Sequence, residues 1–232
     1  MTPADWDVAV FRAIHHGWHH PWLDPIMMAL TDPGPWKFPL LALVALAFLL
    51  RGRRGWIGLV ILCLTIAAAD QLSSHILKPV FRRIRPSTAL TDTVPLFGRR
   101  TSYSFPSTHA SNFFSAAPVV SAVFPQLTVF AYVYAGAVCL SRIYVGDHYP
   151  SDVLAGTVLG LFLGFLGRRA YRRAMVTLAG RSVAARGERA PSGGPCRLDH
   201  DGASKRWPPR TRCIRAPRGW RTPGLRPRGG RS

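Results

Sequence analysis

Acidic residues and lysine are scarce in this chain. Its 232 residues include 11 Asp and Glu against 30 Lys and Arg, so the net charge is +19, and only three of the cations are lysines. The imbalance is concentrated at one end, because the stretch from Arg168 onward holds 18 of the 30 basic residues and three acids. This stretch lacks a repeat or interleaved aromatic residues, so it does not favour nucleic-acid binding. We expect no specific nucleic-acid partner.

Cysteine is too sparse and too scattered to organise the fold. Cys63 and Cys139 lie within apolar runs, Cys196 and Cys213 lie in the basic stretch, and no pair has CxxC spacing. Disulfide frameworks and zinc sites both need cysteines at characteristic spacings. The pattern therefore predicts free thiols and no zinc.

Residues 1–35 lack the uninterrupted apolar core of a signal peptide. Apolar and polar residues alternate over about 5–31, with a break at His20-Pro21, which predicts one or two amphipathic helices in the membrane interface. A sixth, poor membrane span near 22–35 is an alternative. No carboxylates stand at ligand spacing beside the histidines of this segment, so we assign those histidines to an interfacial polar face and expect no metal site: His15, His16, His19 and His20.

Long apolar runs dominate the middle of the chain. A spanning helix needs about 20 mostly apolar residues, and the candidates are 36–50, 55–77, 109–124, 126–142 and 151–167, of which the first and last are short. They predict an all-α, polytopic bundle of five to six spans in residues 36–170, set in the lipid bilayer with its active site at the membrane surface. Residues 171–232 form a basic tail, and from about 180 it is too poor in apolar residues to pack, so we expect disorder.

Arginine clusters predict the orientation of the bundle. One cluster, at 51–54, follows the first predicted span, and another, at 168–173, follows the last. Basic loops tend to stay in the cytoplasm, so five spans place the loops at 78–108 and 142–150 together on the outer face. The first of these loops is itself equally basic. An anion site accounts for part of that charge but leaves four arginines without an explanation: Arg82, Arg83, Arg99 and Arg100.

Three cations lie where they could bind a phosphate group. Lys78, Arg85 and Arg142 would stabilise charge on the phosphate oxygens, the two guanidinium groups through forked donors. Taken alone, Lys78 and Arg85 could equally be snorkelling side chains at the end of a span. Arg142 is harder to explain in this way, because it closes an apolar run six residues before His148.

A short polar segment, Pro106-Ser107-Thr108-His109, precedes the third apolar run. Free backbone amides at the start of a helix and the positive end of the helix dipole favour an anion. Ser107 and Thr108 are therefore candidates for phosphate binding, with simple N-capping as the alternative. His109 follows in the first turn, where it would face the anion.

His148 and Asp152 are four residues apart. On a helix that begins near His148 both lie on one face, so the carboxylate can accept the imidazole Nδ1–H and leave Nε2 free to attack phosphorus. The pattern predicts a phosphohistidine at His148, with His109 as general acid and then general base. A structural His–Asp pair is the alternative. An unpaired acid ahead of an apolar span is costly, so we expect Asp152 to have a partner.

At these residues the sequence resembles the type 2 phosphatidic acid phosphatase superfamily, whose pattern is Lys-x6-Arg-Pro, Pro-Ser-Gly-His and Ser-Arg-x5-His-x3-Asp. The first and third motifs are matched in full at Lys78–Pro86 and Ser141–Asp152, and the second except that Thr108 replaces glycine. The motifs cover about 75 residues. The resemblance implies an all-helical membrane enzyme without a metal or other cofactor. Threonine would be strained at this position if the loop required positive φ.

The resemblance also implies a role for each candidate residue. His148 would attack, Asp152 would orient it and His109 would exchange protons, while the phosphate would be bound by Lys78, Arg85, Ser107, Thr108 and Arg142. The implied partner is a membrane lipid substrate: an isoprenyl pyrophosphate such as undecaprenyl pyrophosphate, phosphatidylglycerophosphate or phosphatidate. Two alternatives are a vanadium haloperoxidase-like enzyme and a catalytically silent membrane scaffold with a basic recruitment tail. The sequence indicates no oligomeric state.

Overall fold

The structure is a computed structural model that describes residues 4–32 and 34–187, and these ranges form helices, turns and loops without a strand. The predicted all-α class is confirmed, and each of the five apolar runs is helical. The α-helices are α1 (Asp5–His15), α2 (Asp24–Thr31), α3 (Lys37–Leu49), α4 (Gly52–Gln71), α5 (Lys78–Phe81), α6 (Pro86–Ala89), α7 (Thr108–Val123), α8 (Thr128–Tyr144) and α9 (Pro150–Gly187). Short 3₁₀ or π turns are η1 (Gly34–Trp36), η2 (Leu72–Leu77) and η3 (Pro125–Leu127).

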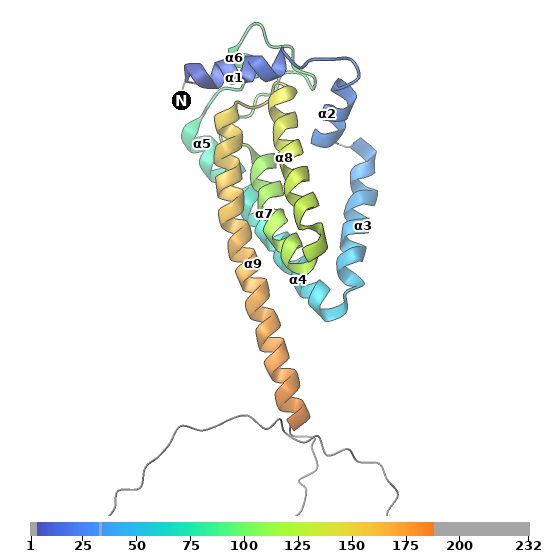
Figure 1. Ribbon diagram of the computed structural model, residues 1–232. Helices are drawn as coiled ribbons and strands as arrows, with labels where there is room; N and C mark the ends of the chain where they lie inside the picture. The colour runs from blue at the N-terminus through green and yellow to red at the C-terminus, as the bar shows by residue number, and fades with distance from the viewer. Residues whose placement is uncertain (1–3, 33, 188–232) are drawn as a thin grey trace, which may run out of the picture. The chain divides into compact units, whose positions relative to one another are not determined.

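The bundle is built around α7, which packs against α4, α8 and α9 (Figure 1). Three segments of the described chain are long and apolar enough to cross a membrane: Gly52–Ala89, Pro125–Tyr144 and Pro150–Gly180. The other two apolar helices are shorter, since α3 has 13 residues and α7 has 16. Figure 1 shows α3 standing beside the bundle, joined to it through α4, and α1 lying across one end.

Glycines allow α9 to approach α7 closely. Three glycines recur every four residues along α9: Gly156, Gly160 and Gly164. A Cβ at any of these positions would lie within 2.7 Å of a backbone carbonyl oxygen of α7 or of its N-cap residue. Small residues at such spacing let membrane helices approach until their backbones touch. The start of α7, with His109, is thereby fixed against the first turns of α9, with Asp152.

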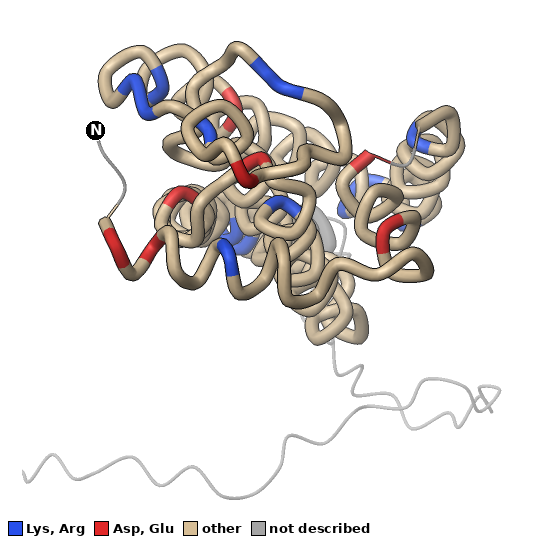
Figure 2. Tube along the Cα trace, turned by 90° about the horizontal axis from the view of Figure 1, so that it is seen from above, with Lys and Arg blue, Asp and Glu red and all other residues tan. Residues whose placement is uncertain are grey.

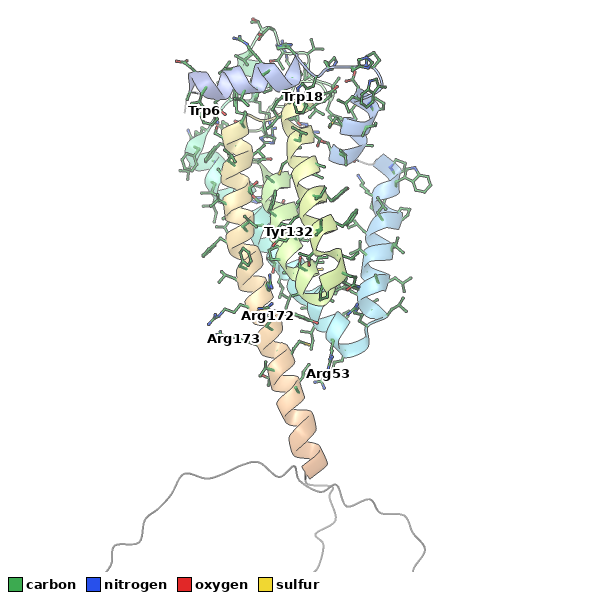
Figure 3. The ribbon with its side chains drawn as sticks, in the orientation of Figure 1. Trp6, Trp18, Arg53, Tyr132, Arg172 and Arg173 are labelled. Carbon is green, nitrogen blue, oxygen red and sulfur yellow. The ribbon has the colours of Figure 1, made fainter. Side chains whose placement is uncertain are left out.

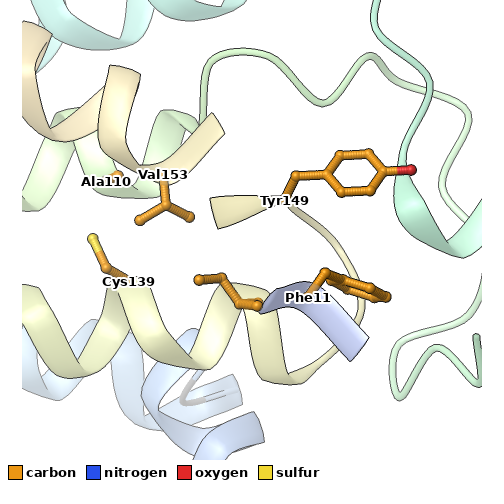
Figure 4. Close-up of a cluster of buried hydrophobic side chains, with 6 residues drawn as sticks. Phe11, Ala110, Cys139, Tyr149 and Val153 are labelled. Carbon is orange, nitrogen blue, oxygen red and sulfur yellow. The ribbon is translucent and has the colours of Figure 1, made fainter. Parts of the chain in front are cut away.

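The N-terminal segment forms two helices, α1 and α2, as its amphipathic pattern predicts. Phe11 of α1 is buried in a cluster with side chains from α7, α8, α9 and the residue before α9 (Figure 4): Ala110, Cys139, Ile143, Val153 and Tyr149. His15 differs from the prediction of an interfacial polar face, because it is buried and its Nδ1–H donates to the carbonyl oxygen of Tyr144 at 2.6 Å. The last carbonyl groups of a helix lack partners within it, and His15 supplies one for the last residue of α8.

The last helix is longer than the sequence analysis predicts. The predicted span ends near 167, whereas α9 continues through 171–187, a segment assigned to the basic tail. This segment is rich in alanine and arginine, which have high helix propensity even where no core is available. The rest of the predicted disordered tail, 188–232, lies outside the described residues.

The two ends of the bundle differ in their side chains. Figure 3 shows Trp6 and Trp18 at the end that α1 crosses, and Arg53, Arg172 and Arg173 at the opposite end, with Tyr132 between them. Tryptophan is enriched at membrane interfaces and arginine at the cytoplasmic ends of membrane helices, so both ends fit a bundle that spans a bilayer. Figure 2 shows the molecule from the end that α1 crosses, and both acidic and basic residues are seen along the chain in this view.

Candidate active site

A cavity of about 370 Å³ lies where α7 begins and α8 ends. Six of the eight predicted site residues line it: Lys78, Arg85, Thr108, His109, Arg142 and His148. The other two, Ser107 and Asp152, are fully buried. Ser107 precedes Thr108 in the chain, and Asp152 Oδ2 lies 3.7 Å from His148 Nδ1. The structure therefore brings together three segments that are far apart in the sequence.

The cations reach the cavity from three elements. Lys78 begins α5 directly after the π turn η2, an irregularity that is frequent at functional sites. Arg142 comes from the last turn of α8. Arg85 precedes α6, and its guanidinium is held by two contacts to Ser102, from Nε to the carbonyl oxygen at 2.8 Å and from Nη2 to Oγ at 3.0 Å. The converging cations make the cavity suitable for a phosphate group.

Asp147 was not singled out by the sequence analysis, although it neighbours His148. Its buried carboxylate accepts a hydrogen bond from Arg142 Nη2 and lies 3.8 Å from Arg85 Nη1 and 3.5 Å from Arg100 Nε. Arg100 also lines the cavity, so one arginine left unexplained by the sequence belongs to this site. Asp147 offsets the mutual repulsion of the cations and holds them around the cavity.

The loop between α8 and α9 presents His148 to this cation cluster. Gly146 has a φ of +87°, a conformation that favours glycine and allows the sharp turn. Arg85 Nη1 lies 3.2 Å from His148 Nε2. Arginine can only donate, so Nε2 is the acceptor and carries no proton. Burial, followed by the charges of Arg85 and Arg142, lowers the pKa of His148 well below its usual value, so the imidazole is neutral and its Nε2 accepts from Arg85 beside the cavity.

Asp152 is paired with His148, but more loosely than the spacing predicts. The distance from Asp152 Oδ2 to His148 Nδ1 is 3.7 Å, beyond hydrogen-bond range. Oδ2 accepts the backbone N–H of Tyr149 at 2.9 Å instead. The partner that Asp152 was expected to have is Arg83, whose Nη1 donates to Oδ1 at 2.6 Å.

The start of α7 offers an anion fewer free hydrogen-bond donors than the sequence predicts. The Ser107 amide donates to the backbone carbonyl of Asp152 at 2.9 Å, because the two helix ends pack together, so this amide is not free for phosphate. The Ser107 hydroxyl is buried and has no hydrogen-bond partner among the described residues. Thr108 begins α7 and lines the cavity. In the described ranges Arg82 alone among non-glycine residues has positive φ, so Thr108 in place of glycine is not strained.

A second cavity, of about 740 Å³, adjoins the first, with which it shares Arg100, His109, Phe113 and Arg142. The rest of its lining is mainly apolar and comes from α2, α3 and α8: Leu30, Leu40, Leu41, Val44, Phe130 and Tyr134. A cation-lined space thus opens into a hydrocarbon-like one. No motif or apolar run in the sequence indicates this second cavity, because it depends on how α3 stands beside the bundle.

Cations around a cavity, a neutral histidine in its wall and apolar helices beside it define the class: a membrane-embedded phosphohydrolase. The chain belongs to the PAP2 superfamily, whose sequence model matches residues 58–175. This match confirms the family that the three motifs resemble.

Relatives agree with this assignment. Lipid A 4'-phosphatase of Bacteroides thetaiotaomicron is 35% identical over 161 residues, which cover 65% of this chain and 71% of that protein. Phosphatidylglycerophosphatase B of Bacillus subtilis is 34% identical over 159 residues, covering 63% and 74%. The crystal structure of Aquifex aeolicus LpxE matches with a TM-score of 0.60 and 29% identity over 73% of this chain and 99% of that one.

Proposed function

We propose that the protein releases phosphate from a membrane lipid phosphate or isoprenyl pyrophosphate through a phosphohistidine at His148. The observation that carries this proposal is the unprotonated Nε2 of His148 at the wall of a cavity lined by cations. A neutral imidazole there is a nucleophile, and the surrounding charges stabilise the phosphoryl group during its transfer.

In the first half-reaction the phosphate occupies the cavity. Lys78, Arg85 and Arg142 bind its oxygens, and the Ser107 hydroxyl and Thr108 supply further donors. His148 Nε2 attacks phosphorus, the N–P bond forms as the P–O bond to the leaving group breaks, and Asp152 stabilises the imidazole as it gains charge. The negative charge of the bound phosphate offsets the surrounding cations, so His109 takes up a proton as the substrate binds and donates it to the leaving oxygen.

In the second half-reaction water replaces the leaving group. His109, now neutral, accepts a proton from the water as its oxygen attacks phosphorus. The N–P bond breaks, inorganic phosphate is released and His148 returns to its neutral form. The same cations neutralise the developing charge in both steps, so the cycle is complete with the residues of the chain and water.

A lipid substrate is supported by the apolar cavity beside the phosphate site. A head group in the first cavity and a hydrocarbon chain in the second would occupy connected spaces. Relatives carry the names lipid A 4'-phosphatase, phosphatidylglycerophosphatase B and undecaprenyl-diphosphatase. These names define the substrate panel for this chain, to which phosphatidate is added.

We further propose that the active site faces away from the cytoplasm. It lies at the end that α1 crosses, whereas Arg53, Arg172 and Arg173 lie at the opposite end (Figure 3). Arginine-rich ends are retained in the cytoplasm.

Phosphate release from this panel by detergent-purified protein tests the proposed function. We expect release from at least one lipid, continued release in excess chelator, and inhibition by orthovanadate, which mimics the transferring phosphoryl group. His148→Ala is expected to abolish release. A folded wild-type protein that releases no phosphate from any lipid would favour the silent scaffold instead.

A further inference from the structure

Arg83 is a buried cation whose guanidinium faces two carboxylates and not the phosphate cavity. Its side chain is 1% exposed. Nη1 donates to Asp152 Oδ1 at 2.6 Å, and Nη2 donates to Asp7 Oδ2 at 2.5 Å. The guanidinium lies over the ring of Tyr149, with Cζ 4.3 Å from the ring centroid. A buried charge is costly unless it is paired, and here one cation joins two buried acids.

Asp7 brings the N-terminal helix α1 into this network. Its Oδ1 accepts the backbone N–H of Ser151 at 2.9 Å, and Oδ2 accepts the Ser151 hydroxyl at 2.5 Å. Ser151 lies in the first turn of α9, where amides lack partners within the helix and the helix dipole favours negative charge. At its other end α1 contacts α8 through His15 and Tyr144. The helix therefore bridges both ends of the loop that carries His148.

The two oxygens of Asp152 have different partners. Oδ1 accepts from Arg83, while Oδ2 accepts from the Tyr149 amide and faces His148 Nδ1. The carboxylate is rigid, so whatever holds Oδ1 also sets the direction of Oδ2. Because the guanidinium fork binds with defined geometry, Arg83 determines how the carboxylate is turned beside His148.

We infer that Asp7 and Arg83 are positioning residues for the His148–Asp152 pair, which makes the N-terminal helix part of the catalytic apparatus. The inference rests on the proposed function, since it needs His148 to be the nucleophile. Two carboxylates and one guanidinium leave one net negative charge behind the imidazole. That charge stabilises His148 as it becomes positive while the N–P bond forms.

A double-mutant cycle on Asp7 and Asp152 in the full-length protein tests this inference. The readout is the rate of phosphohistidine formation, measured by rapid quench with dioctanoyl phosphatidate, which is soluble enough for mixing. Asp7→Asn is expected to slow this step about tenfold. KM should change by less than about twofold, because Asp7 does not touch the substrate. In the Asp152→Asn background the same substitution should change the rate by less than about twofold, since residues that act through one another are not additive.

Matched variants separate positioning from folding. Asp5→Asn removes an exposed charge from the same helix and should leave the rate unchanged. Asp7→Glu keeps the carboxylate and should recover part of the loss. Arg83→Lys keeps the charge but loses the fork, so it should slow phosphohistidine formation about tenfold in a protein that still melts cooperatively.

Two results would overturn the inference: a folded Asp7→Asn protein with the wild-type rate, or an equal loss in both backgrounds, which would mean that α1 only supports the fold. If Asp7→Asn does not fold, the cycle of Arg83→Lys with Asp152→Asn gives the same two outcomes. Failure of the proposed function looks different. In that case the wild type forms no phosphohistidine, or His148→Ala releases phosphate as fast as the wild type.

Discussion

At the scale of single residues, the cation cluster depends on Asp147. This carboxylate contacts Arg142 and Arg85 inside the protein. Removing one partner of a buried ion pair leaves an uncompensated charge, which costs about 3 kcal/mol or more. We expect Asp147→Asn to lower the melting temperature in the absence of anions. Orthovanadate should raise it by more than in the wild type, because the anion replaces the missing charge.

Asp92→Asn is the matched control for this substitution. Asp92 is exposed and pairs with Arg12 away from the cavity, and exposed ion pairs contribute little to stability. Its melting temperature and its response to orthovanadate should equal those of the wild type. If Asp147→Asn behaves in the same way as this control, Asp147 does not hold the cluster together.

The lowered pKa of His148 makes a prediction about stability and pH. The imidazole stays neutral in the folded protein, whereas in the unfolded chain it binds a proton below its ordinary pKa of 6.5. Its contribution to stability is therefore fully present above pH 6.5 and is lost as the pH falls below that value. We expect the wild-type melting temperature to fall between pH 7.5 and pH 5.5, and that of His148→Gln to fall less. An equal fall in both proteins would contradict the shift.

The assignment of His109 as general acid is tested by the leaving group. A phosphomonoester leaves as a strongly basic alkoxide that needs a proton, whereas a pyrophosphate leaves as a weakly basic phosphate. His109→Ala should therefore slow the first step by about 10²–10⁴-fold for monoesters and by less for pyrophosphates. Rapid-quench measurement isolates this step from the later attack of water. Equal losses for both substrate classes would assign His109 to binding alone.

Residues that stand in short motifs could be identified from the sequence, whereas residues whose partners are set by packing could not. His148, His109 and the three cations predicted to bind phosphate stand in short motifs, and the structure gathers them at one cavity. Arg83 stands inside the first motif but pairs with Asp7, 76 residues away in the chain. No spacing rule reveals such a pair, because it forms only when α1 lies across the bundle.

At the scale of elements, the contact between α7 and α9 controls the relation between His109 and the His148–Asp152 pair. A Cβ at Gly160 would lie 2.5 Å from the carbonyl oxygen of Ser111, so the helices must separate to admit it. We expect Gly160→Ala to lower stability by about 1–3 kcal/mol and to reduce turnover, because His109 moves away from His148. Thermal melting and phosphate release measure the two effects.

Gly136→Ala is the control for this contact. Gly136 lies in α8, and a Cβ there would meet nothing within 4 Å. Alanine has a higher helix propensity than glycine, so this variant should be as stable as the wild type or slightly more stable. Loss of stability in both variants would show that glycine is needed in these helices for a reason other than close approach.

The helices themselves were largely predictable, because apolar runs of about 20 residues encode membrane spans. The end of α9 was not, since the arginines at 168–173 resemble the start of a basic tail while the residues around them favour a helix. The docking of α1 was not predictable either. Its amphipathic pattern fits a membrane surface, and only the packed structure places Phe11, Asp7 and His15 against protein.

At the scale of the whole molecule, the two cavities predict that a soluble phosphate ester is a poor substrate. The phosphate site opens into an apolar space lined by α3 and α8. Burial of a hydrocarbon chain there contributes about 0.8 kcal/mol per methylene group. Lipids with longer chains should therefore have lower KM values until the cavity is filled, while kcat, which we assign to chemistry in the first cavity, should stay the same.

The orientation of the bundle gives the last prediction. The active-site end is opposite the end that carries Arg53 and Arg172 (Figure 3), and arginine-rich ends are retained in the cytoplasm. Single cysteines at Thr91 and Thr177, both exposed, are placed in a protein without its native cysteines. On intact cells an impermeant thiol reagent should label position 91 and not position 177, and both should react after the membrane is permeabilised. The reverse labelling pattern would place the active site on the cytoplasmic side. The basic loop around Arg99 and Arg100 would then be the arginine-rich segment that stays in the cytoplasm.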